Sequence, residues 1–220
     1  GRYIMLSLTW RFGTFSGPQG NRMGPGRGPG GPGPGGWGGQ QAVSGADGIH
    51  ADGTLTISGG SVYIDSAYEG LEANVVNVSG GYTVVTAADD AVNATKGPES
   101  PQVSISGGFL DVSVSPNGDV DGIDSNGSYT QTGGVVITRG PSSEMAAAID
   151  AENGVAITGG TLIVLGYGRV SAGGSVKQVS LSLHSEGSHT VTVDGTEYSF
   201  TNAYSYGSTC CWSSGSVSGK

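Results

Sequence analysis

Apolar and polar residues alternate along much of this chain, with the two-residue period that is typical of β-strands. The first alternating stretch is residues 3–12, "YIMLSLTWRF". Its apolar face consists of Ile4, Leu6, Leu8, Trp10 and Phe12. Because a single strand cannot hydrogen-bond its own backbone, this stretch needs a partner strand in the same chain or in a neighbouring one.

Further alternating stretches recur around a phrase that ends in two glycines. The second glycine of the phrase is Gly60, Gly81, Gly108, Gly134 and Gly160, so the steps are 21, 27, 26 and 26 residues. A repeat of this size is typical of solenoids. A second phrase precedes each pair, first as "DGIHA" and then as "EGLEA", "DAVNA", "DGIDS" and "AAIDA". One repeat is longer because it carries the insertion "TKGPES" at 95–100.

The repeats align their apolar residues into columns. One column consists of Leu55, Val76, Val103, Tyr129 and Val155, and another of Ile49, Leu71, Val92, Ile123 and Ile149. Three short strands in each repeat, each with one inward column, predict an all-β fold, a parallel β-helix of about five coils. The double glycine is expected at a corner between two strands, where a positive φ costs glycine nothing.

The pattern divides the chain into five segments: an N-terminal strand at 1–16, a Gly/Pro-rich arm at 17–42, the parallel β-helix at 43–170, an antiparallel cap at 171–212 and a Ser/Gly tail at 213–220. The cap is expected because the repeat is lost after residue 170 and Asp194-Gly195 is a typical two-residue hairpin turn. A cap also protects the open edge of a stack of strands.

Charge adds a second prediction, because the net charge of −9 is unevenly spread. Residues 1–46 carry four arginines and no acid, whereas residues 47–152 hold fifteen of the eighteen acids. Such an acidic body is a poor surface for nucleic acid and a plausible one for cations. No run of about 18 apolar residues predicts a transmembrane helix. Cys210 and Cys211 are adjacent, which indicates neither a disulfide framework nor a zinc site.

Stacked repeats would bring the acids of the second phrase into columns about 4.8 Å apart from strand to strand. Like charges at this spacing repel, so the columns need protons, solvent or a cation. A hard cation with oxygen ligands fits this inventory, and we expect more than one calcium ion. The predicted ligands are Asp47, Glu69, Glu72, Asp89, Asp90, Asn93, Asp119, Asp121, Asp124 and Asp150. The alternative is a solvated acidic face that keeps the chain soluble.

The strand after each double glycine is also apolar on its outward side. A patch of this kind needs a cover, and the candidates are the N-terminal strand, a second subunit or the faces of sugar rings. The predicted carbohydrate-binding or partner-binding residues are Tyr63, Tyr82, Val84, Phe109, Val135, Ile137 and Lys96. The predicted assembly residues are Ile4, Leu6, Leu8, Trp10, Phe12, Arg22 and Arg27. No catalytic residue is assigned, because Lys96 is a loop lysine whose use as a base has little support.

The phrases "GIHADGTLTISGGSVYI", "YEGLEA", "ADDAVNA" and "DGIDSNG" resemble a bacterial carbohydrate-binding family of right-handed parallel β-helices related to pectate lyases. The resemblance covers roughly residues 43–170. It implies a single-stranded right-handed solenoid in a secreted or cell-surface protein. It also implies binding of cellulose-like or acidic polysaccharide without clear lyase activity, and calcium held by Asp89, Asp90, Asn93, Asp121 and Asp124. Ala147 departs from this pattern, because it replaces the first acid of the last repeat.

Three functions are therefore open from the sequence. The first is an extracellular calcium-binding protein that binds polysaccharide and is not an enzyme. The second is the subunit of an extracellular filament that polymerises through its N-terminal strand. The third is a pectate-lyase-like polysaccharide lyase.

Overall fold

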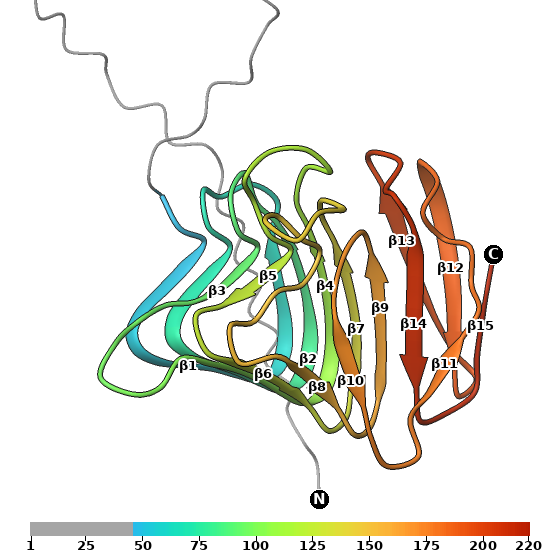
Figure 1. Ribbon diagram of the computed structural model, residues 1–220, viewed down its shortest axis with the longest axis horizontal. Coiled ribbons are helices and arrows are strands. Elements are labelled where there is room, and N and C mark those ends of the chain that lie inside the picture. Colours follow the sequence, from blue (N-terminus) through green and yellow to red (C-terminus); the bar gives the residue numbers. More distant parts are fainter. Residues whose placement is uncertain (1–45) are drawn as a thin grey trace, which may run out of the picture.

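The computed structural model describes residues 46–220, and every regular element in this part of the chain is a β-strand (Figure 1). The predicted N-terminal strand at 1–16 and the arm at 17–42 lie outside the described residues. The predicted assembly residues therefore lie outside them too: Ile4, Leu6, Leu8, Trp10, Phe12, Arg22 and Arg27. No helix that could cross a membrane occurs between residues 46 and 220.

The strands of the repeats are β1 (Ile49–Ile64), β2 (Leu71–Thr86), β3 (Val92–Ala94), β4 (Gln102–Ser113), β5 (Ile123–Ser125), β6 (Ser128–Gln131), β7 (Val135–Arg139), β8 (Val155–Ile157), β9 (Thr161–Leu165) and β10 (Val170–Ala172). The C-terminal strands are β11 (Lys177–Val179), β12 (Gly187–Val193), β13 (Thr196–Asn202), β14 (Thr209–Ser213) and β15 (Val217–Gly219).

The structure confirms the all-β prediction and corrects the predicted architecture. Twelve strands form one curled sheet, a half-barrel in Figure 1, and not the single-stranded right-handed parallel β-helix solenoid that the sequence predicted. Strands β1 to β10 pair in parallel, whereas β14 pairs antiparallel with β9 and β11 antiparallel with β14. The antiparallel pairs come from the chain after residue 170, which has lost the repeat and whose strand β14 runs along β9 in the opposite direction. The sheet is therefore mixed.

The predicted alignment of the repeats is confirmed as the register between neighbouring strands. Leu55 lies opposite Val76, Val76 opposite Val103, and Val103 opposite Tyr129, which in turn lies opposite Val155. Most of these inward side chains are fully buried and form the main hydrophobic core. At the β1 end, however, Ile49, Leu55 and Val62 are only half-buried.

The double glycines form the predicted corners, and the structure adds a second reason for them. The second glycine of each pair has a positive φ, for example 79° at Gly108. A Cβ atom on Gly108 would also lie 2.7 Å from the backbone carbon of Gly80 in the preceding repeat. Successive corners thus stack backbone on backbone, which leaves no space for a side chain.

The C-terminal segment covers one face of the sheet. Strands β12, β13 and β15 form a separate three-stranded antiparallel sheet, and its hairpin turns at Asp194-Gly195 as predicted. Its apolar residues pack against the outward side chains of β4, β7 and β9 in a second hydrophobic core. Arg139 fixes this contact, because its buried guanidinium pairs with Asp111 and donates to the carbonyl oxygen of Thr201 at 3.0 Å.

Candidate functional site

Oxygen-rich side chains line one corner of every repeat, and we call this arrangement the acidic ladder. In the strand register, His50 lies opposite Glu72, Glu72 opposite Asn93, and Asn93 opposite Asp124. A neighbouring column contains Asp47, Glu69, Asp90 and Asp121, whose repeats are joined by hydrogen bonds such as Gly70 N–H to the Asp90 carbonyl oxygen at 2.9 Å. The two columns that the sequence predicted therefore exist side by side.

Burial makes the ladder electrostatically costly. Burial, the charge of Glu72 and the charges of other ladder acids raise the pKa of Glu69 to about 7, against the opposing effect of Asn93. Burial raises the pKa of Asp90 to about 8, and the charges of Asp121 and Asp124 add to the shift, although the Asp121 N–H donates to the Asp90 carboxylate. The pKa values of Asp121 and Asp124 rise to about 6, also mainly through burial. At neutral pH without a cation nearby, Asp90 therefore favours its protonated form and Glu69 is about half protonated, whereas Asp121 and Asp124 are mostly ionised.

Two buried oxygen atoms in the ladder have no hydrogen-bond partner among the described residues. They are Glu69 Oε2 and Asn93 Oδ1, and Asn93 is only 9% exposed. An unpaired buried oxygen is destabilising, because it loses its water without gaining a donor. A carboxylate oxygen and an amide oxygen are both ligands that Ca²⁺ prefers, and the surrounding carboxyl groups supply further oxygens. This part of the ladder therefore contains oxygen donors of the kinds that calcium takes.

A smaller cluster lies at the β1 end of the ladder. Oxygen and nitrogen atoms of Asp47, His50 and Glu72 all lie within 4.8 Å of one another. The His50 Nδ1 atom is 2.5 Å from a Glu72 carboxylate oxygen, and this contact, with Asp52 as a second one, raises the pKa of the imidazole. The cluster is exposed at His50, so the contacts that hold it are open to water.

The structure distributes the other predicted metal ligands unevenly. Asp89 is half-buried beside Asp90, whereas Asp119 and Asp150 are exposed. The register makes Glu72, Asn93 and Asp124 successive neighbours, and backbone hydrogen bonds place Glu69, Asp90 and Asp121 in the adjacent column. In residues 46–220, the one group of three acidic or histidine side chains whose ligand atoms all lie within 4.8 Å of one another is Asp47, His50 and Glu72.

The predicted carbohydrate-binding patch is partly covered by the C-terminal sheet. Phe109, Val135 and Ile137 are buried, the first at 3% exposure, in the core under β12 and β13. Val84 is half-buried, and Tyr63 is exposed at the β1 end. Lys96 stands in the exposed insertion, and in residues 46–220 no hydrogen bond or ion pair joins it to another side chain. This placement does not add support for a base at Lys96.

Aromatic rings run in a row across the strands toward the C-terminal hairpin. Tyr82 stacks on Phe109 with centroids 4.6 Å apart, and Phe109 stacks on Tyr198 of β13 at 4.7 Å. Tyr63 contacts Tyr82 in a tilted arrangement at 6.0 Å. Both faces of the Phe109 ring are therefore in contact with other rings, so this ring has no face left for a sugar.

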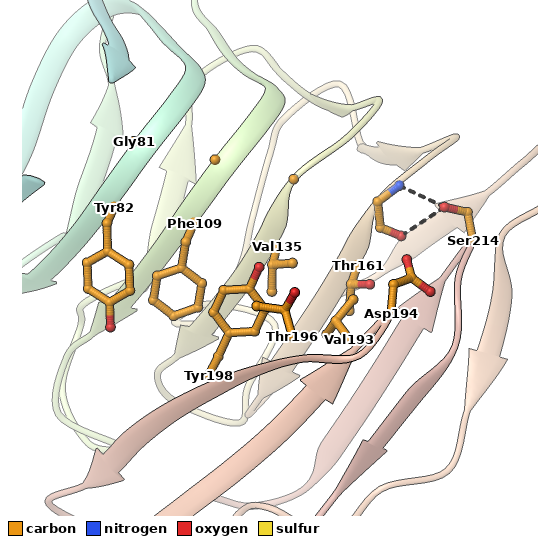
Figure 2. A pocket seen from close by; sticks show the side chains of 13 residues that line it. Gly81, Tyr82, Phe109, Val135, Thr161, Val193, Asp194, Thr196, Tyr198 and Ser214 are labelled. Carbon is orange, nitrogen blue, oxygen red and sulfur yellow. Dashed lines mark hydrogen bonds between the residues drawn. The ribbon is translucent and has the colours of Figure 1, made fainter. Parts of the chain in front are cut away.

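A groove of about 510 Å³ lies between the glycine corners and the β12–β13 hairpin (Figure 2). Its floor is formed by the corners at Gly81, Gly108, Gly134 and Gly160 and the residues that follow them. Figure 2 shows Tyr82 and Phe109 at one end, and Asp194 and Ser214 at the other. The volume is within the range of small-ligand pockets.

Sequence reasoning missed the hairpin wall of this groove. Asp194, Thr196 and Tyr198 come from the turn and from β13, and Ser214 follows β14. Thr196 and Tyr198 share one face of β13 by strand alternation, which the sequence shows. What the sequence could not show is that this face lies over the glycine corners, because no repeat relates the two segments.

Comparisons with known proteins give one finding. A family described as "carbohydrate-binding domain-containing protein" matches residues 37–91, about a quarter of the chain. The matched range includes β1 and β2, with the first two steps of the acidic ladder and Tyr63 and Tyr82. No curated protein and no solved structure gives a significant match.

Proposed function

We propose that this protein binds polysaccharide and that calcium in the acidic ladder stabilises the binding-competent fold. The observation that carries the proposal is the match of residues 37–91 to a carbohydrate-binding family. The exposed Tyr63 and the groove beside the aromatic row support it, because aromatic and hydroxyl-bearing side chains suit the mixed apolar and polar surface of a sugar.

Calcium would be held by Glu69, Asp90, Asn93, Asp121 and Asp124. The support is the pair of unpartnered buried oxygens together with carboxyl groups that are costly to ionise without a cation. When bound, the ion neutralises like charges that would otherwise repel across the strands. The ladder and the groove contain different residues, so the expected role of the ion is to stabilise the sheet.

The proposed site of action is outside the cell or at its surface. Calcium sites of extracellular modules work at roughly 10⁻⁴–10⁻³ M, which suits a partly exposed ladder of this kind. The resemblance of residues 43–170 to a family of secreted or cell-surface β-helix proteins supports the same location. Surface labelling of intact source cells with an antibody against the protein tests it, and a signal that appears only after lysis would contradict it.

The test of binding is retention on a panel of insoluble and soluble polysaccharides, neutral and acidic, with calcium present. We expect retention on at least one class and none on a protein-coated matrix. A folded protein that is retained on no member of the panel overturns the proposal.

Calcium is tested separately by titration calorimetry of the purified protein. Glu69→Gln removes one ladder charge while keeping the side-chain shape, and Glu186→Gln makes the same change at an exposed glutamate outside the ladder. We expect calcium affinity to fall about tenfold or more in the first variant and to stay unchanged in the second. Equal affinities would contradict the ladder as the site.

A second candidate function is assembly into a filament, and one observation favours it. Within residues 46–220, β1 pairs with β2 alone, so its other edge offers unpaired backbone groups beside half-buried apolar side chains. Open edges of this kind accept strands from other chains. The alternating stretch at 3–12 has the pattern of such a strand, although it lies outside the described residues.

Electron microscopy of the full chain with calcium tests this candidate. The double variant Ile4→Asp and Leu8→Asp alters the apolar face of the stretch, and Ser7→Asp with Thr9→Asp is the matched change on its other face. We expect filaments in the wild type and the control, and discrete particles in the first variant. Discrete particles in the wild type under all calcium concentrations would reject assembly.

A further inference from the structure

The groove between the glycine corners and the β12–β13 hairpin has a shape and a charge that select among polysaccharides. We propose that it binds an extended, neutral polysaccharide chain and disfavours chains of uronic acids. This inference rests on the proposed function, since it names the ligand class and the place of binding.

The shape of the groove suits an extended chain. Its floor crosses four successive repeats at Gly81, Gly108, Gly134 and Gly160, which carry no side chains that would interrupt it. Neighbouring strands are about 4.8 Å apart, so the floor runs about 14 Å across the sheet. This spacing is close to the advance of one ring in an extended β-linked sugar chain, so successive rings would meet equivalent positions of successive repeats.

The lining of the groove offers both apolar and polar contacts. Val135 and Val193 are apolar lining residues, whereas Thr196 and Tyr198 bring hydroxyl groups. Neither of these two hydroxyls has a hydrogen-bond partner within residues 46–220, and the same holds for Tyr82. A pyranose ring presents C–H groups on its faces and hydroxyls around its rim, so it satisfies both kinds of wall.

The charge of the groove argues against acidic sugars. Asp194 is the only ionisable acid or base that lines it apart from the tyrosines, and none of the described lining residues is Lys, Arg or His. Recognition of carboxylate groups ordinarily uses arginine or lysine. A uronate chain would instead place its carboxylates near Asp194 without a counter-charge. The Asp194 carboxylate can accept hydrogen bonds from the hydroxyls of a neutral sugar, although one of its oxygens already accepts from Ser216 N–H at 2.8 Å.

The test uses a bulky residue to fill the groove without disturbing the core. Thr196 is exposed and lines the groove, so Thr196→Trp is expected to block it. Ser199 is exposed on the opposite face of the same strand, so Ser199→Trp adds the same residue outside the groove. Thermal melts of both variants first establish that they are folded.

Calorimetry with cellohexaose and with an oligogalacturonate of equal length then gives the readout. We expect the wild type and Ser199→Trp to bind the neutral hexamer with equal affinity, and Thr196→Trp to bind it at least about tenfold more weakly. Asp194→Asn replaces the Asp-Gly turn with an Asn-Gly turn and removes the charge that repels uronates. The difference in affinity between the neutral hexamer and the oligogalacturonate should therefore become smaller.

The alternative outcomes separate the inference from the proposed function. If the wild type binds polysaccharide on the panel and Thr196→Trp binds it equally well, the groove is not the site and only the inference fails. If Thr196→Trp loses binding but the wild type prefers the oligogalacturonate, the place is right and the ligand class is wrong. If the folded wild type binds no polysaccharide at all, the proposed function fails and the inference fails with it.

Discussion

The two ends of the curled sheet are built from the same repeat but differ in how well they are covered. Tyr63, Val84, Asp111, Ile137 and Ile163 occupy one outward column in successive strands. Tyr63 at the β1 end is 36% exposed, whereas Ile137 and Ile163 near the other end are fully buried. The burial of this column therefore depends on the C-terminal sheet, which packs on β4, β7 and β9 and not on β1.

This difference in burial shows that the repeats and the C-terminal segment have separate structural roles. The repeats set the register of the sheet, the inward core and the acidic ladder. The non-repeating C-terminal segment covers the last strands and forms one wall of the groove. A change at the covered end should cost stability, whereas a change at the open end should leave the fold nearly intact.

The largest effect is expected from Arg139→Ala at the covered end. This change leaves the buried Asp111 carboxylate without its partner and removes the contact to Thr201. We expect a loss of about 3–5 kcal/mol in the free energy of unfolding, measured by urea titration. Arg169→Ala is the control, because it removes an exposed, solvent-screened pair with Glu144 and should leave the free energy of unfolding nearly unchanged. Equal losses in the two variants would contradict the anchoring role of Arg139.

The next largest loss of stability is expected from an alanine at a stacked glycine corner, compared with an alanine at an open one. Gly60 has a φ of 77° and open space where the methyl group of an alanine would lie, so Gly60→Ala should cost only about 1–2 kcal/mol for the backbone conformation. Gly108 has a similar φ, but its new Cβ atom would meet the Gly80 backbone. We expect Gly108→Ala to cost about 2–5 kcal/mol by urea titration. A cost at Gly60 as high as that at Gly108 would refute the stacking argument.

The acidic ladder should make the stability of the fold depend on pH. In the folded protein the pKa values of Glu69 and Asp90 are raised to about 7 and about 8, above the value of about 4 for an unfolded carboxyl group. Between about pH 4 and 8 the folded state therefore binds more protons than the unfolded state. The free energy of unfolding consequently falls as the pH rises through this range. Melting temperatures measured in a chelator should fall over this window, and added calcium should restore them at pH 8. A flat profile in the chelator would contradict the buried ladder.

The smallest effect on stability is expected from Tyr63→Ala at the open end. This side chain is exposed and makes one tilted aromatic contact, so the free energy of unfolding should change by about 0.5 kcal/mol or less. Ile163→Ala in the same column should cost about 2–5 kcal/mol, because it leaves a cavity under the C-terminal sheet. Similar costs for both variants would show that the two ends are covered alike.

The sequence predicted the parts of the molecule that repeat. The step between double glycines is sufficient to align Leu55 with Val76 and Val103. The second phrase, which lies before the insertion at 95–100, places Glu72 beside Asn93. Each of these pairings joins one repeat to the next, so the repeat in the sequence is sufficient to predict it.

The sequence did not predict how the non-repeating segment lies on the repeats. Nothing in the pattern around Arg139 indicates that it reaches Thr201 in β13, 62 residues further along the chain. For the same reason the sequence placed Phe109 among surface residues, whereas the C-terminal sheet covers it. The predicted solenoid failed at this point too, since the antiparallel return of β14 along β9 has no periodic signal.

The stacked glycine corners have a consequence for how such a chain can change in evolution. Each corner after the one at Gly60 contacts the backbone of the repeat before it, so a duplicated repeat would meet the same surface that its parent meets now. One duplication event would add a row to the groove floor and a step to the acidic ladder at the same time. The number of repeats therefore sets the length of the groove floor and the number of carboxyl groups in the ladder together, as a single trait.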